Sequence, residues 1–277
     1  MLLVVAMAAT FVACSLTTSL DGLTGGAEGG AAEGGAAEGG SAESGSAESG
    51  TDGPTADGGT GDGDAGEGGP IDPCAGAVLC DQFERAAPDG IWTSIYTDNG
   101  GTVTIDPTTS TSGTRSVALF VPATGNPHAQ LGSPAYSNVA HARISWSMKT
   151  GSPNRSISLM RLQIDENNRA SVIDIFMFDG LFVMDENVFG TPSAGYADYS
   201  LLAGFQVDTW QRWTMELDAR AATAVGIVTL DGVERIRTNL KNTYAKGVLK
   251  ILVGAFYAPD GPAQTLHYDD IAVTILP

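Results

Sequence analysis

Short runs of alternating apolar and polar side chains fill residues 79–277, and they limit the possible folds of this chain more than any other feature. Each run is broken by Gly, Pro, Asn or Asp, and none shows the 3.6-residue period of a helix. Strands in this number without crossover helices predict an all-β, two-sheet antiparallel sandwich of the jelly-roll kind. The clearest runs are Thr102–Asp106, Arg115–Val121, Ala142–Met148, Ile157–Asp165, Ala170–Phe178, Leu181–Asp185, Gln211–Asp218, Ala224–Leu230, Val233–Leu240, Val248–Tyr257 and Thr265–Leu276.

The turns and the core follow from the same pattern. Asp179-Gly180 and Asp231-Gly232 are hairpin signals, and residues 165–168 form a longer predicted turn. Alternate side chains of a strand point to opposite faces of its sheet, so one set in each run faces the core. The predicted core set is Trp146, Met148, Met160, Leu162, Ile164, Ile173, Ile175 and Met177.

The segment before these runs has a composition that opposes folding. Residues 15–73 hold 12 acidic residues and 19 of the 36 glycines but no Lys or Arg, and no large apolar side chain lies between Leu23 and Ile71. Nothing there can offset the entropy lost on ordering. Residues 14–73 are therefore predicted to be a lipidated Cys followed by a disordered acidic spacer, and residues 74–277 the folded domain. A repeat expansion without a selected length is the alternative interpretation of the spacer.

The first thirteen residues are predicted to be an export signal. Thr10 is their one polar side chain, and an apolar helix of this size is about 20 Å long, too short to cross a hydrocarbon core of about 30 Å. The run ends Phe11-Val12-Ala13-Cys14-Ser15, which resembles a bacterial lipobox. That resemblance implies lipidation of Cys14, a membrane partner through the lipid anchor, and a bacterial cell-envelope location, at the outer membrane or cell surface. An unmodified cysteine in an ordinary signal peptide is the alternative.

The two remaining cysteines are predicted to pair. Cys74 and Cys80 stand at the start of the folded domain, beyond the export signal, and an oxidising compartment favours a disulfide between them. A zinc site is the alternative, but it would need further ligands, and the three histidines are scattered through the chain.

The charge balance excludes one class of partner. The chain has a formal net charge of −18, and residues 74–277 still carry 20 acidic against 14 basic residues. Nucleic acid requires a basic surface, so no nucleic-acid partner is expected. The oligomeric state is not predicted by the sequence.

Several stretches resemble a known superfamily. They are CDQFERA, GGTVTID and SGTRSVAL near the start, the Val207–Trp213 stretch followed by MELD and VGIVTLDGVE, and the ending HYDDIAVTILP. Together they are similar to the concanavalin A-like lectin/glucanase superfamily, whose members include laminin-G-like jelly-roll domains. The resemblance covers roughly residues 79–277 and implies a fold more than an activity. A galactose-binding-like jelly roll shares the opening and the ending.

The catalytic motifs of that superfamily are incomplete here. Its glucanases carry two carboxylates in an E-x-D-x-x-E strand, and the nearest stretch, VIDIFM, has Asp174 at the middle position with Val172 and Met177 at the other two. Its lyases carry a Q-[IV]-H strand, and here Gln163-Ile164-Asp165 lacks the His. No catalytic residue is therefore assigned.

Binding is favoured over catalysis by the side chains opposite the predicted core. Taking three runs as neighbouring strands places two guanidinium groups, an amide, a carboxylate and a ring on one face, and such a set suits a sugar, with Arg matched to an acidic one. A solvated sheet without a ligand is the competing interpretation. The candidate ligand-binding residues are Arg143, Arg161, Gln163, Asp174 and Phe176.

A structural calcium ion between the first and last strands is a further hypothesis, and no cofactor is required. Carboxylates are the ligands that calcium prefers. The candidate ligands are Asp81, Glu84, Asp269 and Asp270, with ordinary surface charge as the alternative.

The sequence thus favours a surface-anchored lipoprotein presenting a non-enzymatic β-sandwich that binds carbohydrate or another extracellular ligand. A degenerate or unrecognised polysaccharide-cleaving enzyme, lyase or glycosidase, and a structural or adhesive envelope protein are the two alternatives.

Overall fold

The computed structural model of the chain describes residues 72–151, 155–166, 169–178, 180–189, 196–201, 206–241 and 246–277. The predicted signal peptide, Cys14 and all but the last two residues of the spacer lie outside these residues and stay predictions. The described residues form strands and connecting turns, as predicted, and none of their segments is a helix long and apolar enough to cross a membrane.

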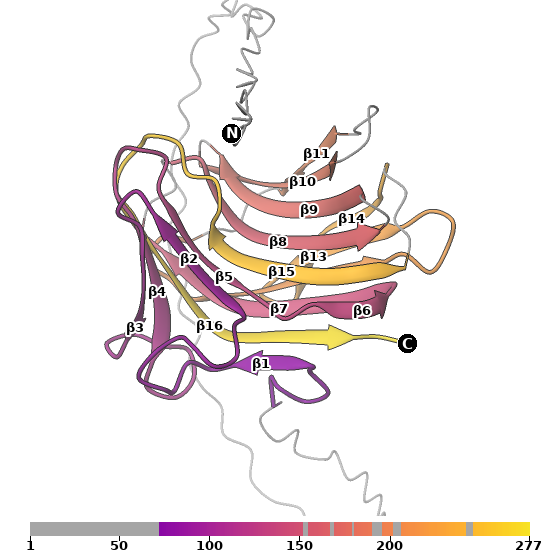
Figure 1. Ribbon diagram of the computed structural model, residues 1–277. Helices are drawn as coiled ribbons and strands as arrows, with labels where there is room; N and C mark the ends of the chain where they lie inside the picture. The colour runs from indigo at the N-terminus through magenta and orange to yellow at the C-terminus, as the bar shows by residue number, and fades with distance from the viewer. Residues whose placement is uncertain are drawn as a thin grey trace, which may run out of the picture. The chain divides into compact units, whose positions relative to one another are not determined.

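The described residues form sixteen strands, arranged in two antiparallel sheets of eight strands each (Figure 1). We call them sheet A and sheet B. Sheet A contains β1 (Leu79–Asp81), β3 (Thr102–Asp106), β4 (Ser116–Val121), β7 (His141–Thr150), β12 (Gln211–Asp218), β13 (Val225–Leu230), β14 (Val233–Asn239) and β16 (Gln264–Ile275). Sheet B contains β2 (Ser94–Asp98), β5 (His128–Gly132), β6 (Tyr136–Val139), β8 (Ile157–Glu166), β9 (Arg169–Phe178), β10 (Leu181–Phe189), β11 (Tyr196–Leu201) and β15 (Gly247–Ala255).

The strand order shows where the chain changes sheet. Sheet A runs β14-β13-β12-β7-β16-β4-β3, with β1 paired to β16, and sheet B runs β11-β10-β9-β8-β15-β5-β2, with β6 paired to β15. The consecutive strands β7 and β8 therefore lie in different sheets, whereas β8, β9, β10 and β11 follow one another across sheet B. This meander brings polar side chains far apart in sequence into register on one face.

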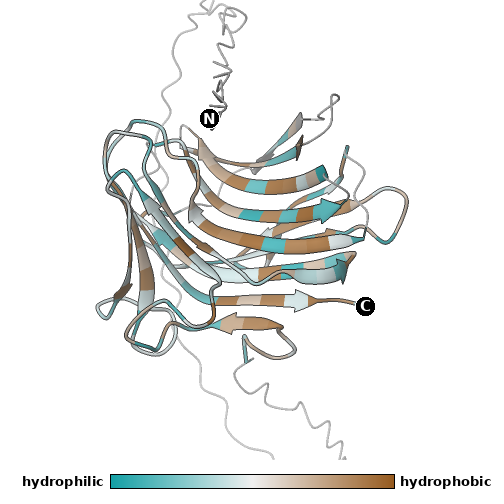
Figure 2. Cartoon of the chain, in the orientation of Figure 1, coloured by the Kyte–Doolittle hydropathy of each residue, from teal (hydrophilic) through white to brown (hydrophobic). Residues whose placement is uncertain are grey.

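Alternation along the strands builds the core between the sheets. Figure 2 shows hydropathy switching from residue to residue along β8, β9 and β15. All eight predicted core residues are buried, and the indole rings of Trp146 and Trp213 stack with centroids 6.0 Å apart and an interplanar angle of 9°. Trp92 is buried too, so packing rather than an exposed stacking platform accounts for Trp92 and Trp213.

Two local predictions are confirmed by the described residues. Asp231 and Gly232 join β13 to β14 with φ of 51° and 75°, the backbone of a two-residue hairpin turn that favours Asp-Gly. Cys74 and Cys80 form a disulfide with their Cα atoms 5.3 Å apart. Because Cys80 lies in β1, which pairs with β16, the disulfide attaches the start of the domain to its last strand. Asp179 and residues 167–168 lie outside the described residues.

Candidate functional site

Four charged or ionisable residues lie side by side on the outer face of sheet B. Arg161 on β8 is opposite Asp174 on β9, Asp174 is opposite Asp185 on β10, and Asp185 is opposite Asp198 on β11. We call these four residues the charged row. The residues before and after Arg161 and Asp174 belong to the core, so the row faces away from it.

Arg161 and Asp174 form a bidentate ion pair at the β8 end of the row. The Arg161 Nε donates to Asp174 Oδ1 over 2.7 Å, and Nη2 donates to Oδ2 over 2.6 Å. Asp174 is only 2% exposed. Burial is the largest influence on the pKa of Asp174 and raises it, while the two hydrogen bonds from Arg161 act in the opposite direction. The guanidinium is thus committed to a carboxylate of the protein, and only its Nη1 lies outside this pair.

Asp185 has a different environment from its neighbour. Its side chain is 8% exposed, and among the described residues its buried Oδ1 has no hydrogen-bond partner. Burial raises the pKa of Asp185 to about 8, with further increases from the charges of Asp174 and Asp198 and an opposing effect from Arg161. The carboxyl of Asp185 is therefore mostly protonated at pH 7, and as an acid it has an O–H to donate.

Aromatic rings from β9, from β10 and from the loop after β15 border the row. The guanidinium carbon of Arg161 lies 4.3 Å from the ring centroid of Phe256 and 5.9 Å from that of Phe189. Phe176 contacts both Phe256 and Tyr257 edge to face, with centroids 6.1 Å and 6.2 Å apart. Phe189 is 47% exposed and Tyr257 50% exposed. Two large ring surfaces are thus accessible beside a line of polar groups.

The loop that carries two of these rings is fixed by buried hydrogen bonds. Ser158 Oγ accepts hydrogen bonds from the backbone N–H groups of Phe256 and Tyr257, each over 2.8 Å. Arg155 is 2% exposed and donates through its guanidinium to backbone carbonyls of two loops, those of Pro122, Ala258, Pro259 and Pro262. The rings therefore have a defined position relative to Arg161.

A second polar group continues the face next to the row. Asp165 Oδ1 accepts a hydrogen bond from Gln163 Nε2 over 2.6 Å, and its Oδ2 accepts one from Lys250 Nζ over 2.9 Å. Burial acts to raise the pKa of Asp165, but the hydrogen bonds from Lys250 and Gln163 outweigh it and lower that pKa. Gln163 and Lys250 are directly opposite one another on β8 and β15.

The structure brings four of the five predicted ligand-binding residues together and separates the fifth. Arg161, Gln163, Asp174 and Phe176 lie on the same outer face, on the adjacent strands β8 and β9. The placement of Arg143 beside them was wrong, because β7 belongs to sheet A and β8 to sheet B. Sequence alternation shows which residues share a face of one strand, but it does not show where the chain crosses to the other sheet.

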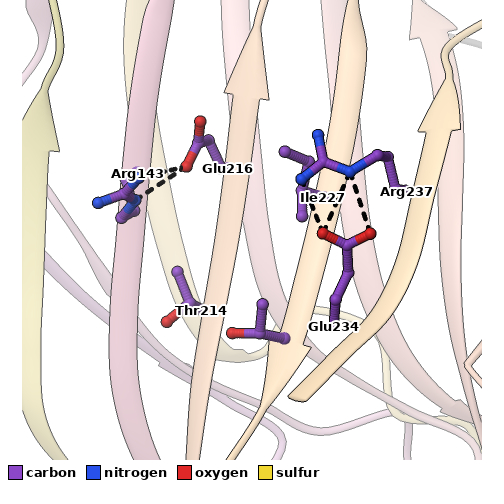
Figure 3. A pocket seen from close by; sticks show the side chains of 7 residues that line it. Arg143, Thr214, Glu216, Ile227, Glu234 and Arg237 are labelled. Atoms are coloured by element: carbon purple, nitrogen blue, oxygen red, sulfur yellow. Dashed lines mark hydrogen bonds and ion pairs between the residues drawn. The ribbon is translucent and has the colours of Figure 1, made fainter. Parts of the chain in front are cut away.

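Arg143 contributes instead to a shallow depression on the outer face of sheet A (Figure 3). Its Nε and Nη2 donate to Glu216 Oε2 over 2.9 Å and 2.7 Å, and Glu216 Oε1 also contacts His141 Nε2 at 2.9 Å. On β14, at the edge of the sheet, Arg237 pairs with Glu234 at 2.7 Å. Each charge that lines the depression is thus paired within the protein. The lining residues are Arg143, Thr214, Glu216, Ile227, Thr229, Glu234 and Arg237.

The four candidate calcium ligands are each held by donors of the protein. Asp81 accepts hydrogen bonds from the Arg85 guanidinium and, over 2.7 Å, from Trp92 Nε1. Glu84 accepts hydrogen bonds from the backbone N–H and the hydroxyl of Thr114 and from the N–H of Arg115.

Asp269 and Asp270 receive hydrogen bonds from one loop. Asp269 Oδ2 accepts from the N–H groups of Thr111 and Ser112, and Asp270 Oδ1 accepts from the Ser112 hydroxyl. Within the described part of the chain, no group of three His, Cys, Asp or Glu side chains is placed to hold a metal ion. The predicted ligand set does not form a cage for calcium, so these carboxylates act here as acceptors that fix loops to β1 and β16. Calcium binding itself stays a prediction.

Sequence analysis missed Asp185 and Asp198, the other two carboxyls of the charged row. One signal could have found Asp185: a two-residue turn at 179–180 places residues equally distant from it opposite one another, and Asp174 and Asp185 are such a pair. Asp198 lies in a strand that the sequence pattern did not indicate, so its register had no basis in sequence.

Comparison with known proteins identifies the fold. No protein-family model matches the sequence, and no curated protein matches it. Among solved structures, the chain is similar to an endo-β-1,4-glucuronan lyase from the fungus Trichoderma reesei, with a TM-score of 0.58 and 13% identity over 72% of this chain and 96% of that one. It is also similar to the cellulose-induced protein Cip1, with a TM-score of 0.52 and 15% identity over 71% of this chain and 96% of that one.

A bacterial structure gives the same result. The GH16 protein of the Bacteroides ovatus mixed-linkage glucan PUL, solved with a G4G4G3G product, matches with a TM-score of 0.52 and 13% identity over 70% of this chain and 99% of that one. Identities this low establish the fold alone. The domain is a concanavalin A-like jelly-roll sandwich, as its sequence resemblance implied.

Proposed function

We propose that this domain binds a polysaccharide across the outer face of sheet B. The observation that carries the proposal is the charged row of Arg161, Asp174, Asp185 and Asp198 beside the exposed rings of Phe189 and Tyr257. A sugar presents hydroxyl groups around its edge and C–H groups on its faces. Polar groups in a line and rings beside them complement both surfaces.

The charges of this face favour a neutral sugar chain over an acidic one. Two cations of this face are already paired within the protein, Arg161 with Asp174 and Lys250 with Asp165. Asp198 adds an exposed carboxyl with no cation opposite it in the register. An acidic sugar would therefore meet a negative surface, so the earlier expectation that arginines match an acidic sugar gives way to a neutral ligand.

The similar structures support a polysaccharide as the ligand class. Their names concern β-1,4-glucuronan, cellulose and mixed-linkage glucan, all of them polysaccharides.

A polysaccharide-cleaving enzyme is the second candidate, and one observation favours it. Asp174 and Asp185 are directly opposite on neighbouring strands, where Cβ atoms are about 4.5–5.5 Å apart, and retaining glycosidases hold two carboxyl groups about 5–5.5 Å apart. Against it, Asp174 is committed to Arg161 by two hydrogen bonds. Prolonged incubation with each bound polysaccharide decides between cleavage and binding alone. Reducing ends released by the wild type but not by Asp185→Asn would establish cleavage. If the wild type releases no reducing ends, the result supports binding alone.

Exposed rings provide the first test of binding. Phe189→Ala and Tyr257→Ala should each weaken binding of a neutral β-glucan by roughly threefold to tenfold, because a ring contact contributes about 0.5–1.5 kcal/mol. Phe120→Ala, which removes an exposed ring from sheet A, is the matched control and should bind like the wild type. Calorimetry of the full chain with neutral and uronic-acid polysaccharides measures both effects. Preference for the acidic polymers, or unchanged affinity in both ring variants, would contradict the proposal.

Display outside the cell is part of the same proposal. A lipid on Cys14 and a spacer over residues 15–73 would hold the domain clear of a bacterial membrane surface, with a reach of about 40 Å for a Gly-rich chain of this size. Metabolic labelling with a palmitate analogue tests the anchor. The wild-type chain should be labelled and Cys14→Ser should not, whereas equal labelling of the two would remove the anchor from this account.

A further inference from the structure

Asp185 lies between two other carboxyl groups and forms no ion pair within the described part of the chain. Asp174 faces it from β9 and Asp198 from β11, while Arg161 on β8, whose charge also acts on Asp185, is bound to Asp174 by both Nε and Nη2. The Asp185 side chain is 8% exposed, and its Oδ1 has no hydrogen-bond partner among the described residues. A buried acceptor without a hydrogen-bond partner is costly when the carboxyl is ionised, and this one belongs to the row that we propose as the ligand site, so protonation and ligand binding at Asp185 are physically connected.

We propose that polysaccharide binding on this face is linked to a proton on Asp185, whose protonated carboxyl donates a hydrogen bond to a sugar oxygen while its ionised form binds weakly. This inference rests on the proposed function, because it assigns the regulation of the same site.

The physical reason is the loss of water when a sugar covers the row. An ionised Asp185 would then be enclosed between two carboxyls, with its charge uncompensated, and burial of an unpaired charge is strongly unfavourable. The protonated acid avoids this cost and supplies the O–H that a sugar hydroxyl or ring oxygen accepts. Ligand and proton therefore favour one another, and each should bind more tightly when the other is present.

The pH range over which affinity should fall follows from the pKa of Asp185 in the protein without ligand. Burial and the two neighbouring carboxyls raise the pKa of Asp185 to about 8, so the proton is present at pH 6 and mostly absent at pH 9. Affinity should be nearly constant below pH 7. It should then fall by about tenfold between pH 7 and pH 9.

The experiment is calorimetry of the full chain with mixed-linkage β-glucan from pH 6 to pH 9, in buffers of different ionisation enthalpy. The wild type should lose about tenfold in affinity and should take up protons on binding at pH 8 and above. Asp185→Asn keeps a donor without a charge and should bind with constant affinity over this range. Asp198→Asn removes a neighbouring charge that raises the pKa of Asp185 and should move the fall in affinity to lower pH. Asp218→Asn, on β12 of sheet A, is the matched control and should keep the wild-type profile.

A second measurement needs no ligand. The folded Asp185 carboxyl holds its proton more strongly than the unfolded one, whose pKa is about 3.8, so this group stabilises the fold at low pH and the stabilisation is lost as pH rises from about 4 to about 8. The urea midpoint of the wild type should thus decrease relative to that of Asp185→Asn over this window.

Each outcome has a distinct meaning. Wild-type affinity that stays constant from pH 6 to pH 9 without proton uptake overturns the inference and leaves the proposed function intact. An equal pH dependence in Asp185→Asn overturns the assignment to this residue. Absence of β-glucan binding at pH 6 overturns the proposed function, and the inference with it.

Discussion

Two aspartates that face each other across β9 and β10 differ in what surrounds them. Asp174 is held by the two-pronged guanidinium of Arg161, whereas Asp185 has a buried oxygen without a partner among the described residues. Residue type and exposure are nearly the same, so the difference arises from one neighbour. The arrangement keeps Asp174 as a fixed structural acceptor, whereas Asp185 is the carboxyl that we propose donates to the ligand.

The Arg161–Asp174 pair should therefore be required for stability. Arg161→Gln leaves a buried carboxyl without its cation and should lower the free energy of unfolding by about 3 kcal/mol, as is typical when one partner of a buried pair is removed. The double variant Arg161→Gln/Asp174→Asn removes both charges and should recover a large part of that loss. Urea unfolding of the three proteins measures it, and a single variant as stable as the wild type would show that the pair has no structural role.

At the scale of the elements, the loop between β15 and β16 links stability to the site. It carries Phe256 and Tyr257, and buried Arg155 fixes it through backbone carbonyls. The position of two rings on the face thus depends on a side chain that lies away from the charged row.

Arg155→Lys should therefore lower both the stability of the domain and its affinity for β-glucan. A lysine cannot reach all the carbonyls that the guanidinium bonds, and each buried acceptor left without a donor costs about 1–3 kcal/mol. We expect a lower urea midpoint together with weaker β-glucan binding at temperatures where the variant is fully folded. Binding that equals the wild type in the folded variant would mean that the loop rings do not contact the ligand.

The sequence predicted most elements because their alternation is strong, and it missed those where alternation is weak. The eleven predicted runs all correspond to strands. The missed strands, β1, β2, β5, β6 and β11, are only three to six residues long. In β2 (SIYTD) all residues are exposed, and β5 (HAQLG) ends in Gly. Edge positions bury little, so they need no apolar periodicity.

The site could be predicted only in part for a related reason. Asp174 and Arg161 lie in strongly patterned strands, and their shared face followed from periodicity together with the prediction that these two consecutive runs are neighbouring strands. Arg143 was misplaced and Asp198 missed because strand neighbours in a sandwich are set by tertiary packing, which local patterns do not specify.

At the scale of the whole molecule, the sandwich presents two outer faces with different properties. On sheet A, a shallow depression is lined by two ion pairs. Arg143 pairs with Glu216 and Arg237 pairs with Glu234, so the charges that line the depression are paired within the protein. On sheet B, the charged row includes a buried oxygen without a partner and has exposed rings beside it. We therefore propose that the ligand binds to sheet B alone.

Mapping the ligand-contacting residues by NMR tests that assignment most directly. A titration of the isotope-labelled chain with a soluble mixed-linkage β-glucan oligosaccharide at pH 6 should shift the backbone amide signals of Arg161, Asp174, Asp185 and Tyr257, while those around Arg143 stay in place. Shifts concentrated on sheet A, with none along the charged row, would contradict the central claim.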